Sequence, residues 1–228
     1  MDALILADGA APDRAALDRA WPGWDAGVGL VIAADGGARH ASQLGVSIDL
    51  WVGDGDSLDA GALAALAASG VPMERSSPNK DESDTELAVR AAIRQGVDGL
   101  IVVGALGGAR IDHEIANIGL LAMPDLVGVG AILLDARSRI VLVRAPGADG
   151  RPVQCALPGR VGDIVSLLPL GPGVTGVTTA GLAYPLVDEP LPAGPARGLS
   201  NIRTAPDAGV TLGGGLLLVV ESPATLPE

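Results

Sequence analysis

The pattern of hydrophobic and polar positions changes once along the chain. Up to about residue 135, short apolar runs rich in Val, Ile and Leu alternate with segments whose apolar residues recur at the helical spacing of three and four. This alternation is typical of a parallel α/β sheet. The predicted strands are residues 3–7, 30–34, 48–52, 100–103 and 131–134, and the predicted helices are residues 37–44, 60–68, 84–95 and 112–121.

From about residue 138, Gly and Pro recur every few residues between short apolar runs, and a segment of helical period is hard to place. Asp149-Gly150 lies between two of these runs and is a hairpin signal. Residues 188–197, rich in Pro and Gly, are expected to form a loop. We therefore predict an α/β N-terminal domain with a mainly parallel sheet, residues 1–136, followed by an all-β sandwich C-terminal domain, residues 137–228.

Charge and cysteine content narrow the function classes. The chain has 228 residues and a net charge of -12, without a basic run, which argues against nucleic acid or an anionic membrane surface as its main partner. The single cysteine, Cys155, cannot form an internal disulfide or anchor a zinc cluster. Neither a secretory signal nor an apolar run of the ~20 residues that a membrane span needs is visible, so a cytoplasmic location is expected.

Acidic side chains follow two of the predicted strands. Asp35 comes after residues 30–34, and Asp54 and Asp56 come after residues 48–52. Because ligands bind beyond the carboxyl ends of parallel strands, these side chains converge if their strands are neighbours. Two carboxylates ~4 Å apart repel by roughly 4 kcal/mol at an effective dielectric of 20, and Mg²⁺ relieves this by binding carboxylates together with phosphate oxygens. The alternatives are a solvated turn for the Asp54 pair and a helix-capping role for Asp35.

Two further segments suit a phosphate ligand. Residues 80–86 form a polar run that leads into a helix with Asp84 as its expected N-cap, and Lys80 offers a positive charge. Residues 104–113 lie between a strand and a helix and combine glycines with Arg110. A solvated helix start is the alternative for the first segment, and the second does not fit the Walker pattern. His40 is expected at the surface, and His113 is expected to be a structural helix residue.

Five motifs in this order resemble thiamine pyrophosphokinase: Asp35-Gly-Gly-Ala, Gly53-Asp-Gly-Asp-Ser57, Lys80-Asp-Glu-Ser-Asp-Thr-Glu86, Gly107-Gly-Ala-Arg-Ile-Asp-His113 and Gly198-Leu-Ser-Asn201. In that family an α/β domain precedes a β-sandwich, and two chains pair so that thiamine lies at the dimer interface. The resemblance implies a cytoplasmic, homodimeric, Mg²⁺-dependent thiamine diphosphokinase, which transfers a diphosphoryl group from ATP to thiamine and releases AMP.

The resemblance also implies roles for individual residues. Asp35, Asp54, Asp56 and Asp84 would hold Mg²⁺, and the last three of these would be catalytic. ATP would contact Lys80, Asp81, Thr85, Gly107, Gly108, Arg110 and Asp112, and thiamine would contact Ser200 and Asn201.

The sequence departs from the family pattern at several positions. Gly55 stands where a bulky apolar residue is usual, Ser83 replaces the commoner Thr, and Ala109 lengthens the usual Gly-Gly-Arg by one residue. Three other readings stay open. One is transfer to another primary alcohol such as a hydroxymethyl pterin. The second is a metal-dependent glycosyltransferase that uses the Asp-x-Asp pair, and the third is a binding module without catalysis.

Overall fold

The computed structural model describes residues 1–10, 13–147 and 149–225. The chain divides into two compact units, Met1–Ala136 (unit 1) and Arg137–Glu228 (unit 2). Among the described residues, none of the helices combines the length and the apolarity that crossing a lipid bilayer requires.

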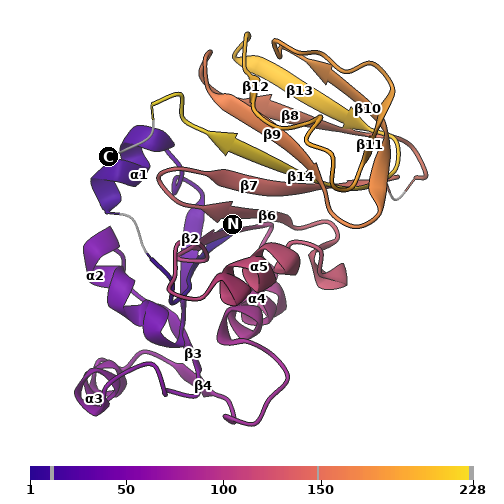
Figure 1. Cartoon of the computed structure of the whole chain (residues 1–228). Helices are drawn as coiled ribbons and strands as arrows, with labels where there is room; N and C mark the ends of the chain where they lie inside the picture. Colours follow the sequence, from indigo (N-terminus) through magenta and orange to yellow (C-terminus); the bar gives the residue numbers. More distant parts are fainter. Residues whose placement is uncertain (11–12, 148, 226–228) are drawn as a thin grey trace. The chain divides into compact units, whose positions relative to one another are not determined.

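Unit 1 alternates strands with helices (Figure 1). Its sheet is parallel and has the strand order β6-β5-β1-β2-β3-β4. Its strands are β1 (Asp2–Leu6), β2 (Val28–Ala34), β3 (Leu50–Gly53), β4 (Met73–Arg75), β5 (Gly99–Val103) and β6 (Gly130–Leu134). Its α-helices are α1 (Arg14–Ala20), α2 (His40–Leu44), α3 (Ala60–Ala68), α4 (Asp84–Arg94) and α5 (Ile111–Leu120), and its short 3₁₀ helices are η1 (Asp35–Arg39) and η2 (Pro124–Leu126).

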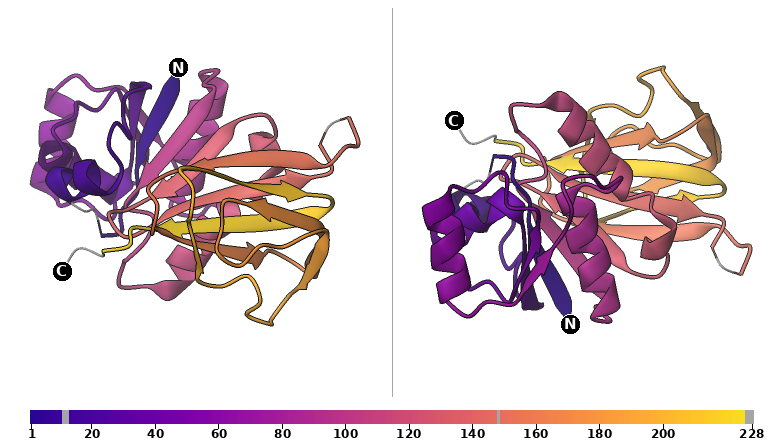
Figure 2. Two further views of the ribbon diagram at one scale, coloured as in Figure 1. Left: turned by 90° about the horizontal axis from the view of Figure 1, so that it is seen from above. Right: turned by 90° about the horizontal axis from the view of Figure 1, so that it is seen from below.

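Helices cover both faces of this sheet, as the continuous apolar runs of its strands require. On one face, Leu4 and Leu6 of β1 pack in one core with Leu17 of α1 and Leu44 of α2. Helix α4 contacts β1, β2 and β3 and buries its small apolar residues, among them Ala88. Figures 1 and 2 show α2 and α4 on different sides of the strands of unit 1.

The strands of unit 1 run parallel and alternate with helices, so the predicted α/β class is confirmed for this part of the chain. Sequence patterns missed α1 and β4, which have only seven and three residues. The helix predicted for residues 37–44 was partly wrong, because the segment begins as a 3₁₀ helix at Asp35 and becomes an α-helix at His40.

Unit 2 is built of β-strands, drawn in salmon, orange and yellow in Figure 2. One group has the order β12-β9-β14-β7, and the second sheet has the order β11-β10-β13-β8. The strands are β7 (Arg139–Ala145), β8 (Val153–Pro158), β9 (Ile164–Pro169), β10 (Gly173–Ala180), β11 (Glu189–Pro192), β12 (Asn201–Ile202), β13 (Asp207–Leu212) and β14 (Gly215–Ser222).

The core of unit 2 lies between its two groups of strands. Val165 and Leu217 of the first group share one buried cluster with Leu157 and Val210 of the second. The pairings within each group are antiparallel, and the cluster between them makes unit 2 a β-sandwich, as predicted.

Two expectations for unit 2 were wrong in detail. The segment predicted as a loop, residues 188–197, contains strand β11 at the edge of the second sheet. Pro190 and Pro192 are tolerated there, because an edge strand leaves some of its N–H groups without a ladder partner. The hairpin signal Asp149-Gly150 connects β7 to β8, which belong to different sheets, so the two strands do not form a hairpin.

Candidate functional site

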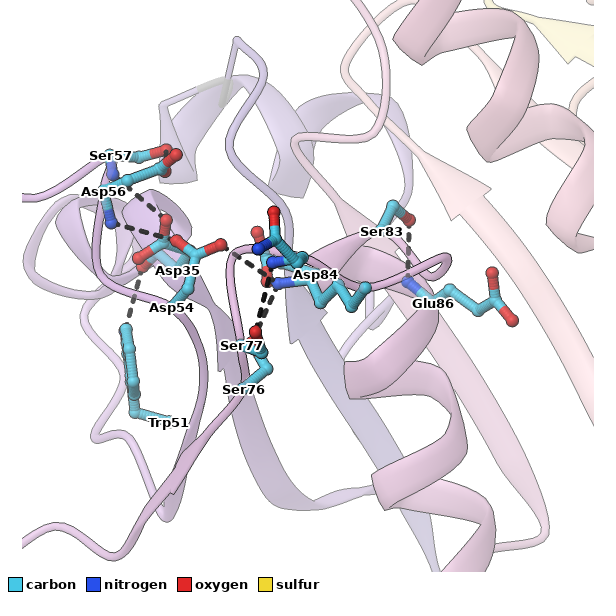
Figure 3. A network of polar contacts seen from close by, with 12 residues as sticks. Asp35, Trp51, Asp54, Asp56, Ser57, Ser76, Ser77, Ser83, Asp84 and Glu86 are labelled. Atoms are coloured by element: carbon cyan, nitrogen blue, oxygen red, sulfur yellow. Dashed lines mark hydrogen bonds and ion pairs between the residues drawn. The ribbon is translucent and has the colours of Figure 1, made fainter.

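Three carboxylates from three separate segments of unit 1 meet at the carboxyl edge of its sheet. Asp35 follows β2, Asp54 follows β3, and Asp84 is the first residue of α4. One carboxylate oxygen of each residue lies within 4.8 Å of the others. We call Asp35, Asp54 and Asp84 the acidic cluster, and Figure 3 shows how their side chains approach one another.

The backbone brings Asp35 and Asp54 together. Strands β2 and β3 are neighbours in the sheet, so the residues that follow them emerge side by side. Asp35 itself has a positive φ of 41°, which is rare for a residue with a side chain. A Cβ on Gly53 would lie 2.8 Å from the Cβ of Asp35, so only glycine permits this close approach at the end of β3. This strained and crowded geometry is typical of functional sites.

Asp84 joins the cluster because its neighbour caps the helix. The sequence predicted Asp84 as the N-cap of α4, but the cap is Ser83, whose hydroxyl oxygen accepts a hydrogen bond of 3.1 Å from the Glu86 N–H. Ser83 and Glu86 have the spacing of a capping box. The predicted N-cap was therefore wrong by one residue. Ser83 caps the helix, and the Asp84 carboxylate remains available to the acidic cluster.

Asp35 is the most buried member of the cluster, with an exposed fraction of 1%. Its Oδ2 accepts a hydrogen bond of 3.1 Å from the Ser57 N–H, whereas its Oδ1 has no hydrogen-bond partner among the described residues. Burial raises the pKa of Asp35 above its ordinary value, and the negative charge of Asp84 adds to the rise. A buried, unpartnered carboxylate oxygen beside two further carboxylates is the donor set that a hard divalent cation such as Mg²⁺ prefers.

Lys80 neutralises part of the charge of the cluster. Its ammonium donates to the Asp54 Oδ2 at 3.3 Å and to a carboxylate oxygen of Asp84. Burial acts to raise the pKa of Asp54, but the Asp56 N–H and the Lys80 ammonium outweigh it and hold that pKa below its ordinary value. With one cation among three carboxylates, the cluster keeps an excess of negative charge.

Other predicted residues of these segments lie outside the acidic cluster. The Asp56 side chain is exposed and accepts a hydrogen bond of 3.1 Å from the Ser57 hydroxyl, while the Asp56 backbone N–H donates to Asp54. Asp81 is exposed, and Thr85 is buried in the first turn of α4. Of the four predicted metal ligands, the structure therefore brings three together and leaves Asp56 at their side.

The glycine-containing loop follows β5, at the point where the strand order of the sheet reverses. Strand β1 lies between β2 and β5, and ligands of open α/β sheets bind at this kind of switch point. The loop is fixed by Asn117 of α5, whose side-chain amide donates to the Ala105 carbonyl at 2.9 Å. Gly107 has a positive φ of 70°, and Gly108 is exposed.

Arg110 and Asp112 are exposed and form an ion pair with each other at the start of α5. The Arg110 guanidinium is thus directed along its own segment. His113 is exposed on α5, whereas His40 is not the surface residue that the sequence predicted. The His40 Nε2 lies 2.9 Å from the Gly9 carbonyl oxygen, and burial lowers the pKa of this imidazole.

Ser200 and Asn201 lie in unit 2, at the start of β12. Ser200 is exposed, has a positive φ of 58° and donates its backbone N–H to the Ser166 hydroxyl at 3.0 Å. Asn201 is buried, and its amide binds the backbone of Tyr184 twice: the oxygen accepts from the Tyr184 N–H at 2.9 Å, and the nitrogen donates to the Tyr184 carbonyl at 2.7 Å. Asn201 therefore holds the exposed Tyr184 in position.

The structure adds polar residues that the sequence analysis did not select. Arg39 pairs with Asp8 and donates to the Ser57 carbonyl at 2.6 Å, which braces the loop that follows β3. Ser76 follows β4, and its hydroxyl binds the Lys80 ammonium at 2.8 Å. Asp8 follows β1 closely, so the rule that selected Asp35 and Asp54 would also have found it. Ser76 escaped because β4 itself was missed.

Comparisons with known proteins point to one family. Residues 25–128 match the family model described as "Thiamin pyrophosphokinase, catalytic domain", and residues 153–217 match "Thiamin pyrophosphokinase, vitamin B1 binding domain". No curated protein sequence matches the chain significantly.

Solved structures of similar fold carry the same name. Thiamine pyrophosphokinase from Bacillus subtilis has 21% sequence identity and a TM-score of 0.80, and the match covers 99% of this chain and 100% of that one. The enzyme from Geobacillus thermodenitrificans has 22% identity and a TM-score of 0.79, with 98% of each chain covered. Thiamin pyrophosphokinase from Candida albicans has 16% identity and a TM-score of 0.75, with 97% of this chain and 89% of that chain covered.

The two family models match most of the chain, one in each of its structural units. The structural matches agree with this division, because they extend over both units. This chain therefore belongs to the thiamin pyrophosphokinase family, the transferases that make thiamine diphosphate.

Proposed function

We propose that this chain transfers the diphosphoryl group of ATP to the hydroxyethyl oxygen of thiamine, which gives thiamine diphosphate and AMP. The observation that carries the proposal is the acidic cluster in a chain of this family, with a buried Asp35 oxygen that has no hydrogen-bond partner in the described part of the chain. Transfer of phosphoryl-type groups depends mainly on positioning and on charge neutralisation, and the residues of the cluster suit both tasks.

Asp35, Asp54 and Asp84 are the proposed ligands of Mg²⁺, with Asp56 beside them as a fourth carboxylate. Bound there, Mg²⁺ would neutralise the charge of the ATP phosphates and orient them. The hard oxygen donors of the cluster fit this ion. One of the carboxylates is proposed to accept the proton of the thiamine hydroxyl late in the reaction.

ATP is proposed to bind at the carboxyl edge of the sheet in unit 1. Lys80 and Arg110 supply positive charge for its phosphates, and the loop with Gly107 and Gly108 lies at the switch point between β1 and β5. Asp81, Thr85 and Asp112 belong to the same two segments and are the further proposed contacts. For Arg110 this role requires a change of partner, because its guanidinium pairs with Asp112.

Thiamine is proposed to bind in unit 2 at the segment of Ser200 and Asn201, and this unit carries the match to the vitamin B1 binding domain. Tyr184 is the only aromatic residue of unit 2 and is exposed, so it is the proposed face on which the ring of thiamine stacks. Asn201 would act here through Tyr184, whose backbone it holds.

The catalytic chain is proposed to be a cytoplasmic homodimer, in which unit 1 acts as the ATP and Mg²⁺ domain and unit 2 as the thiamine-binding and dimerisation domain. Sedimentation of the purified protein, combined with an activity measurement on the same fractions, tests the dimer. A monomer with full activity would remove this part of the proposal.

The decisive experiment is incubation of the purified chain with ATP, Mg²⁺ and thiamine, followed by chromatography of the products. We expect equal amounts of AMP and thiamine diphosphate. A hydroxymethyl pterin offered in place of thiamine is the control acceptor, and a sugar nucleotide offered in place of ATP is the control donor. Formation of ADP in place of AMP, or faster turnover with either control, would refute the proposed reaction.

A further inference from the structure

The ammonium of Lys80 is fully engaged by unit 1. It donates to the Ser76 hydroxyl at 2.8 Å, to the Asp54 Oδ2 at 3.3 Å and to the Asp84 Oδ1. The lysine side chain is 13% exposed. Because an ammonium has three N–H donors, these three partners can occupy all of them. Lys80 in this arrangement has no donor left for a phosphate.

Two of the three partners of Lys80 are members of the acidic cluster. A divalent cation that takes Asp54 and Asp84 as ligands needs the same carboxylates that the ammonium holds. It would also meet a positive charge only a few ångströms away, where like charges repel strongly even at a protein surface. The two cations therefore compete for Asp54 and Asp84.

The third partner is neutral and is anchored to the same part of the sheet. Ser76 follows β4, and its backbone N–H donates to the Gly53 carbonyl at 2.9 Å, directly before Asp54. A hydroxyl partner does not compete for a divalent cation as a carboxylate does. Ser76 can therefore keep the ammonium near the cluster after the carboxylates have been given up.

We propose that Lys80 is a built-in competitor of the divalent cation: it holds Asp54 and Asp84 until a cation binds them, and its release then provides the ammonium for the nucleotide phosphates. This inference rests on the proposed function, because it assigns an order to the binding of cation and nucleotide at the same site. It predicts that cation binding is weakened by Lys80, and that nucleotide binding through Lys80 is strengthened by the cation.

The test is titration of the full chain with Mn²⁺ in the absence of nucleotide, followed by calorimetry or by the paramagnetic resonance signal of free Mn²⁺. We expect Lys80→Met to bind Mn²⁺ about tenfold more tightly than the natural chain, because the competing charge is gone. Arg75→Gln is the matched control: it removes one positive charge from the exposed last residue of β4, and we expect less than about a twofold change for it. Lys80→Gln serves if Lys80→Met does not fold.

A second titration measures the affinity of a non-hydrolysable ATP analogue with and without Mn²⁺. In the natural chain Mn²⁺ should tighten binding of the analogue more than it does in Lys80→Met, since the coupling between the two ligands is reciprocal. Mn²⁺ affinity of Lys80→Met equal to or weaker than that of the natural chain would overturn the inference while leaving the proposed reaction intact. If the natural chain does not bind Mn²⁺ at all, both the inference and the metal assignment fail. If Lys80→Met binds Mn²⁺ more tightly but the natural chain makes no thiamine diphosphate, the inference is supported and only the proposed reaction is refuted.

Discussion

Replacement of Asp35 by Asn tests whether repulsion between the carboxylates of the acidic cluster destabilises the folded chain until a divalent cation binds them. The Asp35 carboxylate is 1% exposed and has an oxygen without a hydrogen-bond partner among the described residues. Asn keeps the size of the side chain, and its amide oxygen can still accept the Ser57 N–H. The change therefore removes the charge with little change of packing.

The magnitude follows from the geometry of the cluster. One carboxylate oxygen from each of its three members lies within 4.8 Å of the others. At this distance two carboxylates repel by roughly 3 kcal/mol at an effective dielectric of 20. The weaker hydrogen bond from Ser57 to a neutral acceptor costs about 1 kcal/mol. We expect Asp35→Asn to raise the free energy of unfolding of unit 1 by about 2 kcal/mol when a chelator has removed divalent cations.

Mg²⁺ should reverse this order of stability. A ligand present at 100 times its dissociation constant stabilises the protein that binds it by about 2.7 kcal/mol. The natural chain gains this stabilisation, whereas Asp35→Asn has lost a ligand and gains little. With Mg²⁺ the natural chain should therefore be the more stable of the two.

Denaturant titration followed by tryptophan fluorescence measures this difference in unit 1 alone, because Trp21, Trp24 and Trp51 all lie there. The Trp51 indole donates to the Asp35 carbonyl at 3.1 Å, so it reports directly on this part of the sheet. Asp81→Asn is the matched control, since it makes the same chemical change at an exposed position of unit 1 outside the acidic cluster, and no nucleotide is present in this measurement. The reasoning would be refuted if, without divalent cations, Asp35→Asn were less stable than the natural chain by more than about 1 kcal/mol.

The same pair of proteins gives a pH dependence of known sign. Burial raises the pKa of Asp35 above its ordinary value of 3.8, so at a pH between the two values the folded chain keeps a proton that the unfolded chain releases. Without cations, the contribution of Asp35 to stability therefore falls as the pH rises from near 3.8 through the raised folded-state pKa, and it is constant above that pKa. The difference in stability between the natural chain and Asp35→Asn should show this fall, and a difference that grows with pH in favour of the natural chain would contradict it.

Three further predictions concern the catalytic carboxylates, the core of unit 2 and the segment around Tyr184. Asp54→Asn and Asp56→Asn should each lower the turnover number by at least about 100-fold in the AMP assay, and a near-normal rate with Mg²⁺ would remove that residue from the site. Arg203→Met should lower the free energy of unfolding of unit 2, measured by calorimetry, by about 3 kcal/mol, because it removes one partner of the buried Glu221 carboxylate. The control is Arg151→Met at an exposed ion pair, which should change this free energy by less than about 0.5 kcal/mol. Asn201→Ala should raise the KM for thiamine about tenfold with a smaller change in kcat, since it removes the two hydrogen bonds that hold the Tyr184 backbone; an unchanged KM would show that this contact does not position the substrate.

Sequence patterns were sufficient for the acidic residues that follow strands. Asp35 and Asp54 were expected to converge because parallel strands present their carboxyl ends at one edge, and β2 and β3 proved to be neighbours. Asp84 was selected for a different reason, as the start of a helix. The Asp84 carboxylate reaches Asp35 and Asp54 because of the path that the chain takes after β4. No local sequence pattern predicts that path.

The contacts that the sequence could not predict are those between side chains far apart along the chain. Lys80 was expected to face a phosphate, yet it binds Asp54, which is 26 residues away. Asn201 was expected to bind substrate directly, yet its amide binds the backbone of Tyr184, which is 17 residues away. Both residues carry hydrogen-bonding groups that suit several partners, so their chemical type alone leaves the choice of partner open.

Gly55 shows how the fold compensates for a residue that departs from the pattern. The family resemblance leads one to expect a bulky apolar side chain at this position, between Asp54 and Asp56. The backbone here has a φ of 86°, a conformation that glycine adopts without strain. A Cβ at Gly55 would lie 3.2 Å from the Leu63 Cδ2 and 3.8 Å from the Trp51 ring, so side chains from α3 and β3 already reach this place. The apolar packing beneath the loop is therefore supplied by neighbouring elements, and the carboxylate of Asp54 keeps its place in the acidic cluster without a bulky residue beside it.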